Sequence, residues 1–231
     1  AGVNAPAAEA EAEQRETNKH VVLRCKKPEE VAGVRRDRKF SLFTVDLRKF
    51  KNVESMKGEL VGVDGAVFLG EMLKVGCCAR LVNLNLGWNR MKKVGCDRLF
   101  DALGKMGASC LVERLDLRMN HLPAASVRKL CKHLRGGALQ RLEVLDLRMN
   151  MVGDEGATAL AHAVLASALA PLLRLYVNSN QIGDIGVSAL FKAFNAEQIF
   201  CPRIEVVNCR DNVVKAETVK TFDPCPIFFQ A

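Results

Sequence analysis

Hydrophobic and polar residues follow one fixed order in the middle of the chain. The stretch reads Leu142-x-x-Leu145-x-Leu147-x-x-Asn150, followed by Gly156, Leu160 and Val164. The first three leucines have the spacing of a short strand that turns alternate side chains inward, and the later apolar residues have helical spacing. The pattern predicts a strand and a return helix in about 30 residues, a unit that needs neighbouring copies to bury its apolar face.

Four further copies share this pattern. Aligned on the Asn, they are Leu81-x-x-Leu84-x-Leu86-x-x-Asn89, Val112-x-x-Leu115-x-Leu117-x-x-Asn120, Leu172-x-x-Leu175-x-Val177-x-x-Asn180 and Ile204-x-x-Val207-x-Cys209-x-x-Asn212. An earlier copy, Leu42-x-x-Val45-x-Leu47-x-x-Phe50, has Phe in place of Asn, and its helical pattern resumes at Gly65 rather than at position 56. We expect an insertion in this copy and interpret it as the N-terminal cap of the stack.

The five Asn-closed copies resemble the leucine-rich repeat of the ribonuclease-inhibitor-like type. The resemblance covers residues 42–222 and implies an α/β solenoid in a horseshoe arc of about six repeats. It implies a parallel sheet on the concave face and helices on the convex face. The family includes inhibitors, sensor regions of NOD-like receptors, actin-capping proteins and the GTPase-activating protein for Ran, so the fold does not select one function.

The chain divides into three expected segments. Residues 1–40 form an N-terminal extension with an Ala/Glu-rich tail and a basic part, residues 41–222 form the repeat domain, and residues 223–231 form a capping tail. Within the extension, Val21-Val22-Leu23 fits a short strand. The chain begins with Ala1 rather than Met, which fits a processed or trimmed product.

The Asn column predicts a structural ladder. A side-chain amide both donates and accepts hydrogen bonds, so stacked amides can satisfy backbone groups where the strands turn. The column consists of Asn89, Asn120, Asn150, Asn180 and Asn212.

Other columns face outward between the leucines and carry charge. Because neighbouring strands lie about 4.8 Å apart, these positions place a ladder of Arg beside a ladder of Asp. The two columns contain Arg48, Arg118, Arg148, Arg210, Asp116 and Asp146, with Tyr176 at an Asp position. Either the opposite charges neutralise each other on a solvated face, or the arginines bind carboxylates of a partner.

The residue before each Asn suggests an apolar patch at the strand exits. Trp88, Met119 and Met149 occupy this position in successive copies, and Tyr176 could extend the patch. Trp and Met are frequent interface anchors, although they could instead lie in the core under the following loop. We expect a protein partner to bind this edge together with the concave face.

Positive charge is concentrated near the N-terminus. The net charge is +8, and residues 18–51 contribute eleven Lys or Arg against four acidic residues. This segment predicts contact with an anionic partner, an acidic protein surface or, as the alternative, RNA. The expected contact residues are Arg24, Lys26, Lys27, Arg35, Arg36, Arg38 and Lys39.

Signs of catalysis are missing from the sequence. No phosphate-binding, nucleophile-elbow or dinucleotide-binding motif occurs, and His121, His133 and His162 fall in separate copies at expected surface positions. Asp154 and Asp184 fit helix N-caps rather than catalytic acids. We expect no enzyme activity, no cofactor, no metal and no small-molecule substrate.

Nine cysteines occur, an odd number without a C-x-x-C pair, and several occupy apolar columns. Buried, reduced thiols in an intracellular protein are the favoured interpretation. No apolar run is long enough to cross a bilayer. We expect a non-catalytic interaction scaffold, a subunit of a large assembly such as a mitochondrial ribosome or a ciliary or flagellar axoneme. The alternatives are a regulator of one protein partner, of the inhibitor or GTPase-regulator type, and an RNA-contacting subunit.

Overall fold

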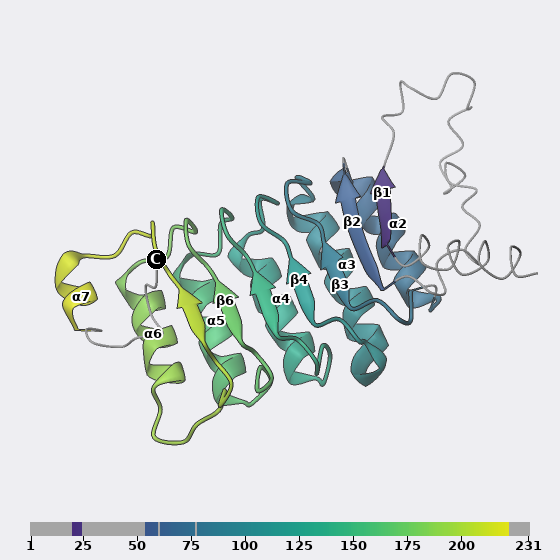
Figure 1. Ribbon diagram of the computed structural model, residues 1–231. Helices are drawn as coiled ribbons and strands as arrows, with labels where there is room; N and C mark the ends of the chain where they lie inside the picture. The colour runs from purple at the N-terminus through teal and green to yellow at the C-terminus, as the bar shows by residue number, and fades with distance from the viewer. Residues whose placement is uncertain (1–19, 25–53, 60, 77, 222–231) are drawn as a thin grey trace, which may run out of the picture.

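Seven parallel strands form one open sheet in chain order, and helices cover one of its faces (Figure 1). The computed structural model describes residues 20–24, 54–59, 61–76 and 78–221. The strands are β1 (His20–Arg24), β2 (Ser55–Glu59), β3 (Asn83–Asn85), β4 (Arg114–Asp116), β5 (Val144–Asp146), β6 (Arg174–Tyr176) and β7 (Val206–Asn208). The helices are α2 (Gly62–Lys74), α3 (Lys92–Met106), the 3-10 turn η3 (Gly107–Ser109), α4 (Ala124–Arg135), α5 (Gly153–Leu165), α6 (Asp184–Phe194) and α7 (Ala216–Lys220).

The strands stack in one register, which aligns the apolar columns of the repeats. Met56 pairs with Leu84, and Leu84 with Leu115, and the same column continues through Leu145 and Leu175 to Val207. All these side chains are buried. Burial of one such side chain stabilises the fold by about 1.5–3 kcal/mol, so the core is a continuous row rather than a set of separate clusters.

The helices return along the other side of the same core. Leu99, Leu130, Leu160 and Leu190 are fully buried at equivalent positions of α3 to α6. Each helix therefore presents its apolar stripe to the sheet and to the next helix, as helical spacing requires. Six strand–helix units, from β2–α2 to β7–α7, confirm the α/β solenoid of about six repeats.

The first repeat differs from the prediction. The strand beside β3 is Ser55–Glu59, not the segment around Val45, and its loop is short rather than extended by an insertion. The N–H of Val61 donates to Asn89 Oδ1 at 2.9 Å, as the N–H of Met91 donates to Asn120 Oδ1 at 3.2 Å one repeat later. The sequence pattern missed β2 because Met56 is its one large apolar residue. Residues 42–50 lie outside the described residues.

The short strand predicted at Val21–Leu23 is confirmed as β1, which pairs in parallel with β2 from His20 to Arg24. The sheet therefore begins inside the segment assigned to the N-terminal extension. The capping tail, residues 223–231, lies outside the described residues, and its role stays a prediction.

The predicted N-caps are wrong. Helix α5 begins at Gly153 after Val152, and α6 begins at Asp184 after Gly183; neither has a side-chain cap from its own N-cap residue. Asp154 and Asp184 instead accept hydrogen bonds from the backbone of the following repeat. The acceptor at the start of each of these helices or segments is thus supplied by the neighbouring repeat, which the sequence of one helix alone does not reveal.

Candidate protein-binding face

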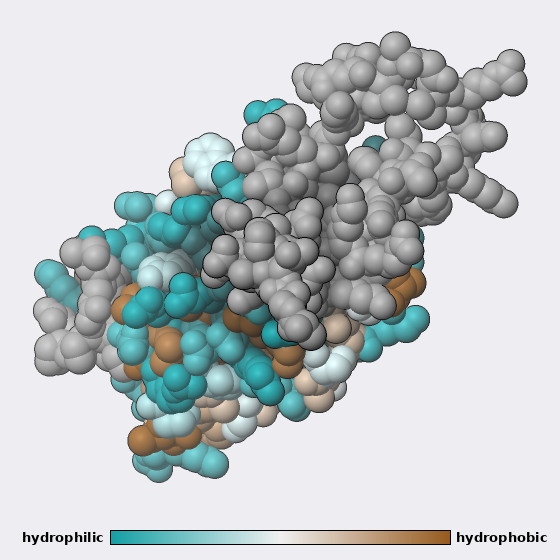
Figure 2. Space-filling view, turned by 45° about the vertical axis from the view of Figure 1, so that its right-hand side comes forward, coloured by the Kyte–Doolittle hydropathy of each residue, from teal (hydrophilic) through white to brown (hydrophobic). Residues whose placement is uncertain are grey.

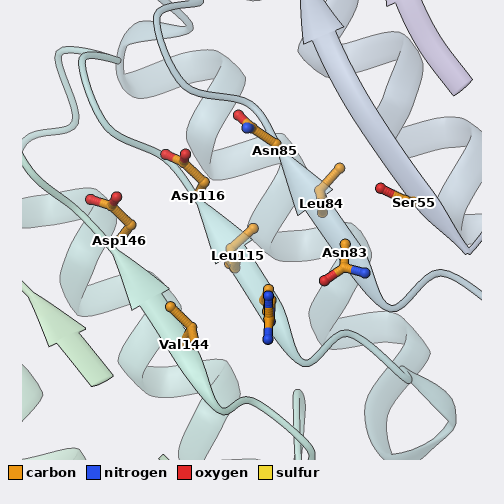
Figure 3. A pocket seen from close by; sticks show the side chains of 9 residues that line it. Ser55, Asn83, Leu84, Asn85, Leu115, Asp116, Val144 and Asp146 are labelled. Atoms are coloured by element: carbon orange, nitrogen blue, oxygen red, sulfur yellow. The ribbon is translucent and has the colours of Figure 1, made fainter. Parts of the chain in front are cut away.

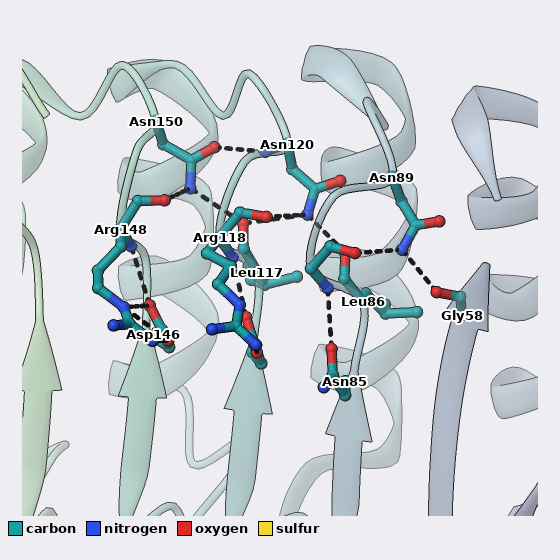
Figure 4. A network of polar contacts seen from close by, with 12 residues as sticks. Gly58, Asn85, Leu86, Asn89, Leu117, Arg118, Asn120, Asp146, Arg148 and Asn150 are labelled. Atoms are coloured by element: carbon teal, nitrogen blue, oxygen red, sulfur yellow. Dashed lines mark hydrogen bonds and ion pairs between the residues drawn. The ribbon is translucent and has the colours of Figure 1, made fainter. Parts of the chain in front are cut away.

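A ladder of buried Asn side chains joins the repeats at the ends of the strands (Figure 4). Asn150 Oδ1 accepts hydrogen bonds from the N–H groups of Asn120 at 2.9 Å and Leu122 at 3.0 Å. Its Nδ2 donates to the carbonyl oxygens of Leu117 and Leu147, both at 2.9 Å. The amide thus satisfies backbone groups of two repeats, which the turn would otherwise leave unpaired.

The same arrangement recurs along the ladder. Asn180 Oδ1 accepts from the N–H of Asn150 at 3.1 Å, and Asn212 Oδ1 accepts from the N–H of Asn180 at 2.8 Å. At the other end, Asn89 Nδ2 donates to the carbonyl oxygen of Gly58 at 2.9 Å. These side chains are occupied with backbone groups, so they hold the strand exits in place rather than face a ligand.

The concave face, the face of the sheet turned away from the helices, carries paired rather than free charges at β5. Arg148 donates to Asp146 from Nε at 2.9 Å and from Nη2 at 2.6 Å (Figure 4). Hydrogen bonds to Asp146, and its charge, raise the pKa of Arg148 above its ordinary value against the effect of burial. The guanidinium carbon of Arg148 also lies 5.2 Å from the centre of the Tyr176 ring. The Arg148 guanidinium is therefore already engaged by Asp146 of β5 and by the Tyr176 ring of β6.

The pair at β4 is looser. Arg118 Nη2 lies 3.1 Å from Asp116 Oδ2, and the buried Arg118 Nε has no hydrogen-bond partner. Burial raises the pKa of Asp116 above its ordinary value, helped by the charge of Asp146 and opposed by the N–H of Arg118 and the nearby arginines. Two interpretations were open for the Arg and Asp columns. Neutralisation of opposite charges within the protein fits Arg148, whereas Arg118 uses only some of its hydrogen-bond donors.

The two ends of the Arg column differ from this pattern. Arg210 is exposed on the segment after β7. Arg48 lies outside the described residues, and Lys57 of β2 stands beside Asn85 at the end of the column that contains Asp116 and Asp146. The placement of Arg48 in the Arg column followed from the misplaced first strand.

The strand-exit residues are exposed and adopt an unusual backbone conformation. Trp88 is 64% exposed and Met149 is 47% exposed, whereas Met119 is half-buried. Trp88, Met119 and Met149 have φ angles of 65°, 55° and 54°, in the left-handed region, as do Ser179 and Asp211 in the same column. Trp, Met and Ser do not favour this conformation, so the sequence gives no sign of it at Trp88, Met119, Met149 or Ser179; Asp211 alone is of a type enriched there.

A shallow groove runs along β3. The outward residues of β3 are Asn83 and Asn85, followed by Gly87, and all three are short and uncharged. Two hollows of about 300 Å³ and 510 Å³ meet at Asn85. We call this feature the β3 groove.

The walls of the β3 groove come from the neighbouring repeats. Ser55, Asn83, Asn85, Asp116 and Asp146 surround the hollow nearer the strand starts (Figure 3). Arg114 also lines this hollow. The hollow nearer the strand exits is lined by Lys57, Gly58, Asn85, Gly87, Trp88, Asn89 and Arg118. Trp88 and Arg118 therefore belong to one site, which the sequence columns placed in separate groups.

The described part of the surface is mixed in character. In the view of Figure 2, hydrophobic residues are scattered among hydrophilic ones rather than gathered in one broad strip. On the face seen in Figure 2, a partner would therefore contact individual exposed side chains rather than one broad apolar strip.

The residues predicted to contact an anionic partner are largely untested. Arg24 ends β1, and its side chain is not described. The other six, Lys26, Lys27, Arg35, Arg36, Arg38 and Lys39, lie outside the described residues.

The cysteine and histidine positions bear on chemistry. The six described cysteines are buried, and they are Cys78, Cys96, Cys110, Cys131, Cys201 and Cys209. His133 is not simply solvated, since its Nε2 lies 3.1 Å from Asp101 Oδ1 across helices α3 and α4. Burial opposes ionisation of Asp101, but hydrogen bonds and charges from Lys129 and His133 lower its pKa overall. The described residues contain no cluster suited to a metal ion.

Among the described helices, each is too short or too polar to span a lipid bilayer.

Comparison with known proteins agrees with the repeat architecture. The family model described as Leucine Rich repeat matches residues 139–161 and 169–191, which cover β5 with most of α5, and β6 with most of α6. A crystal structure of an internalin, InlF, from Listeria monocytogenes is similar at a TM-score of 0.46 and 13% identity. The match covers 80% of this chain and 50% of the internalin chain. A comparison with curated proteins finds no match. Two repeats that match the family model, set in a stack of parallel strands and return helices, make this chain an α/β leucine-rich-repeat solenoid.

Proposed function

We propose that the chain is a non-catalytic protein-interaction scaffold that binds a protein partner at the β3 groove and the strand-exit edge. The observation that carries this proposal is the 64% exposure of Trp88 beside the groove. Leaving a Trp side chain in water forgoes the stabilisation of its burial, and Trp is the residue type most enriched among interface hot spots.

The neighbouring residues support Trp88 as an anchor. Met149 and Met151, at 47% and 49% exposure, lie on the strand-exit side two repeats further along. Methionine adapts its shape to different partners, so these side chains suit the rim of an interface. Arg118 adds a charged group to the hollow that Trp88 lines.

The finer proposal is a structural subunit of a large intracellular assembly, of the mitochondrial-ribosome or ciliary or flagellar axoneme type. The charged N-terminal extension supports it, because such segments often bind neighbouring subunits in large particles.

We also infer the ribonuclease-inhibitor-like subtype from repeats of 30 to 32 residues with helices of 11 to 15 residues in α3 to α6. A soluble regulator of one protein partner is the alternative. The charge of residues 18–51 also favours RNA contact by the same subunit.

Photo-crosslinking in native extract tests the proposal. A photoreactive amino acid at position 88 should give one dominant protein adduct, identified by mass spectrometry, in fractions of high mass. The matched control carries the same group at Ile199, which is 74% exposed on the α6–β7 connection. Equal adducts from both positions, or none from position 88, would contradict the assigned face. Adducts confined to low-mass fractions would support the regulator, and RNA adducts from residues 18–51 that disappear with salt would support RNA contact.

A further inference from the structure

Two arginines of the β3 groove have hydrogen-bond donors that no described residue uses. The Arg114 side chain is exposed and makes no hydrogen bond or ion pair with any described residue. Arg118 Nε is buried without a partner. By contrast, Arg148 binds Asp146 through two nitrogens, and Arg174 binds Glu205 at 3.1 Å. Cations with spare donors therefore line this groove, while those of β5 and β6 are paired.

Gly87 lets Arg118 lie across the floor of the groove. A Cβ atom at position 87 would stand 3.0 Å from Arg118 Cγ and 3.1 Å from Arg118 Nε. It would also stand 3.2 Å from Asp116 Oδ1. The guanidinium thus rests where a side chain would otherwise be, next to Trp88. A planar guanidinium in this position suits a carboxylate, which it can bind through two parallel hydrogen bonds.

The floor of the groove suits an extended backbone. Asn85 Oδ1 accepts from the N–H of Gly87 at 3.1 Å, and the side-chain amide of Asn83 makes no hydrogen bond with the described residues. Asn amides can donate to and accept from the peptide groups of a bound segment. A segment that follows β3 from Asn83 to Gly87 would pass Arg114, then Arg118, and would end at Trp88.

We propose that the β3 groove binds an extended acidic segment of another protein, with carboxylates at Arg114 and Arg118 and an apolar side chain against Trp88. The inference rests on the proposed function and names the chemistry of the partner. The wall carboxylates favour a peptide over a nucleic acid. Asp116 and Asp146 line the same hollow as Arg114 and would repel the regularly spaced phosphates of RNA, whereas a peptide can place its acids only opposite the arginines.

Peptide selection on the full chain tests this proposal. Short random peptides displayed on phage are selected on the wild-type protein, and the enriched peptides are synthesised with a fluorophore for polarisation measurements. We expect them to carry Asp or Glu together with an apolar residue. Arg118→Gln and Arg114→Gln should each weaken binding by about tenfold, and added salt should weaken it further. Gly87→Ala should weaken binding as well, although it removes no charge.

Matched controls separate the possible outcomes. Arg141→Gln removes an exposed arginine outside the groove and should leave affinity unchanged. Urea unfolding of each variant checks that the protein still folds. Peptides that need Trp88 but carry no acid and ignore Arg114 and Arg118 would overturn the acidic segment and leave the proposed face intact. Peptides that ignore Trp88 as well, or no enriched peptide at all, would overturn both. Polyuridine RNA that displaces the peptides and depends on Arg118 would show a nucleic-acid site instead.

Discussion

Asp154 Oδ1, in the first turn of helix α5, lies 2.8 Å from the backbone nitrogen of Gly186, which belongs to the next repeat. The same oxygen accepts the N–H of Gly183 at 2.7 Å. The carboxylate therefore caps the start of α6 from outside that helix, with its charge at the positive end of the helix dipole. Gly186 leaves the necessary space, since a Cβ there would stand 2.7 Å from Asp154 Oδ1.

Asp154→Ala should destabilise the protein by about 1 kcal/mol, because the N–H groups of Gly183 and Gly186 at the start of α6 lose their acceptor. Asp154→Asn keeps one acceptor oxygen and should cost less. Urea unfolding monitored by circular dichroism measures both changes. The matched control is Glu155→Ala, which removes an adjacent exposed carboxylate whose one ion pair among the described residues is with exposed Arg128. A larger loss for Glu155→Ala than for Asp154→Ala would show that the cap contributes little.

Asn150→Ala should cost about 1–3 kcal/mol, because the buried N–H groups of Asn120 and Leu122 lose their common acceptor. Chemical denaturation gives the free energy of unfolding. Asn83→Ala is the control, since that amide lies on the groove floor without a hydrogen bond to the described residues; its effect should stay within about 0.5 kcal/mol. Equal effects of the two substitutions would refute the ladder as a source of stability.

Trp88→Gly should leave stability unchanged or raise it by up to about 1 kcal/mol, while removing the proposed anchor. The residue adopts φ of 65°, a conformation that costs a side chain about 1–2 kcal/mol and costs glycine nothing. The larger backbone entropy of glycine in the unfolded chain offsets part of this gain. Trp88→Val, with a β-branched side chain, should be less stable than both. Thermal melts rank the three proteins, and a glycine variant that melts well below wild type would contradict this account.

Stability should fall as pH rises above about 9, because burial raises the pKa of four thiols. The pKa rises from 9.0 to about 12 for Cys96, Cys131, Cys201 and Cys209. Below pH 9 the thiols are protonated in both states, and their contribution is fully present. Between pH 9 and 12 only the unfolded thiols lose protons, so each lowers the free energy of unfolding by up to ~1.4 kcal/mol per pH unit.

Cys209→Val isolates one of these thiols. Cys209 is buried in a column that elsewhere holds Leu or Val, so the substitution preserves the core. The free energy of unfolding, measured by denaturation between pH 8 and 11, should fall less steeply with pH for the variant than for wild type. The difference in slope should be up to ~1.4 kcal/mol per pH unit. Parallel curves would mean that Cys209 keeps an ordinary pKa in the folded protein.

The repeat period and the core columns could be predicted because each copy repeats the same apolar spacing. The first strand could not, since Met56 alone marks it, and the Leu-rich segment around Val45 matched the pattern better. The left-handed backbone conformation at Trp88 could not be predicted, because Trp is not a residue type that favours it. The pairing of Arg148 with Asp146 rather than with a partner depends on side-chain rotamers, which spacing does not specify. Trp88 and Arg118 line the same groove because Gly87 has no side chain that would occupy the place of Arg118.

The Asn ladder also makes neighbouring repeats depend on each other in unequal ways. Each amide supplies an acceptor to the repeat before it, so the turn at Asn180 relies on Asn212, and the turn at Asn150 relies on Asn180. Truncation after residue 203 would strand the N–H groups of Asn180 and Ile182, whereas loss of β2 would remove from the ladder the Gly58 carbonyl that accepts from Asn89. Unfolding should therefore start more easily at the C-terminal end and proceed towards β3. The contacts that protect the last repeat would then determine how long the β3 groove stays folded.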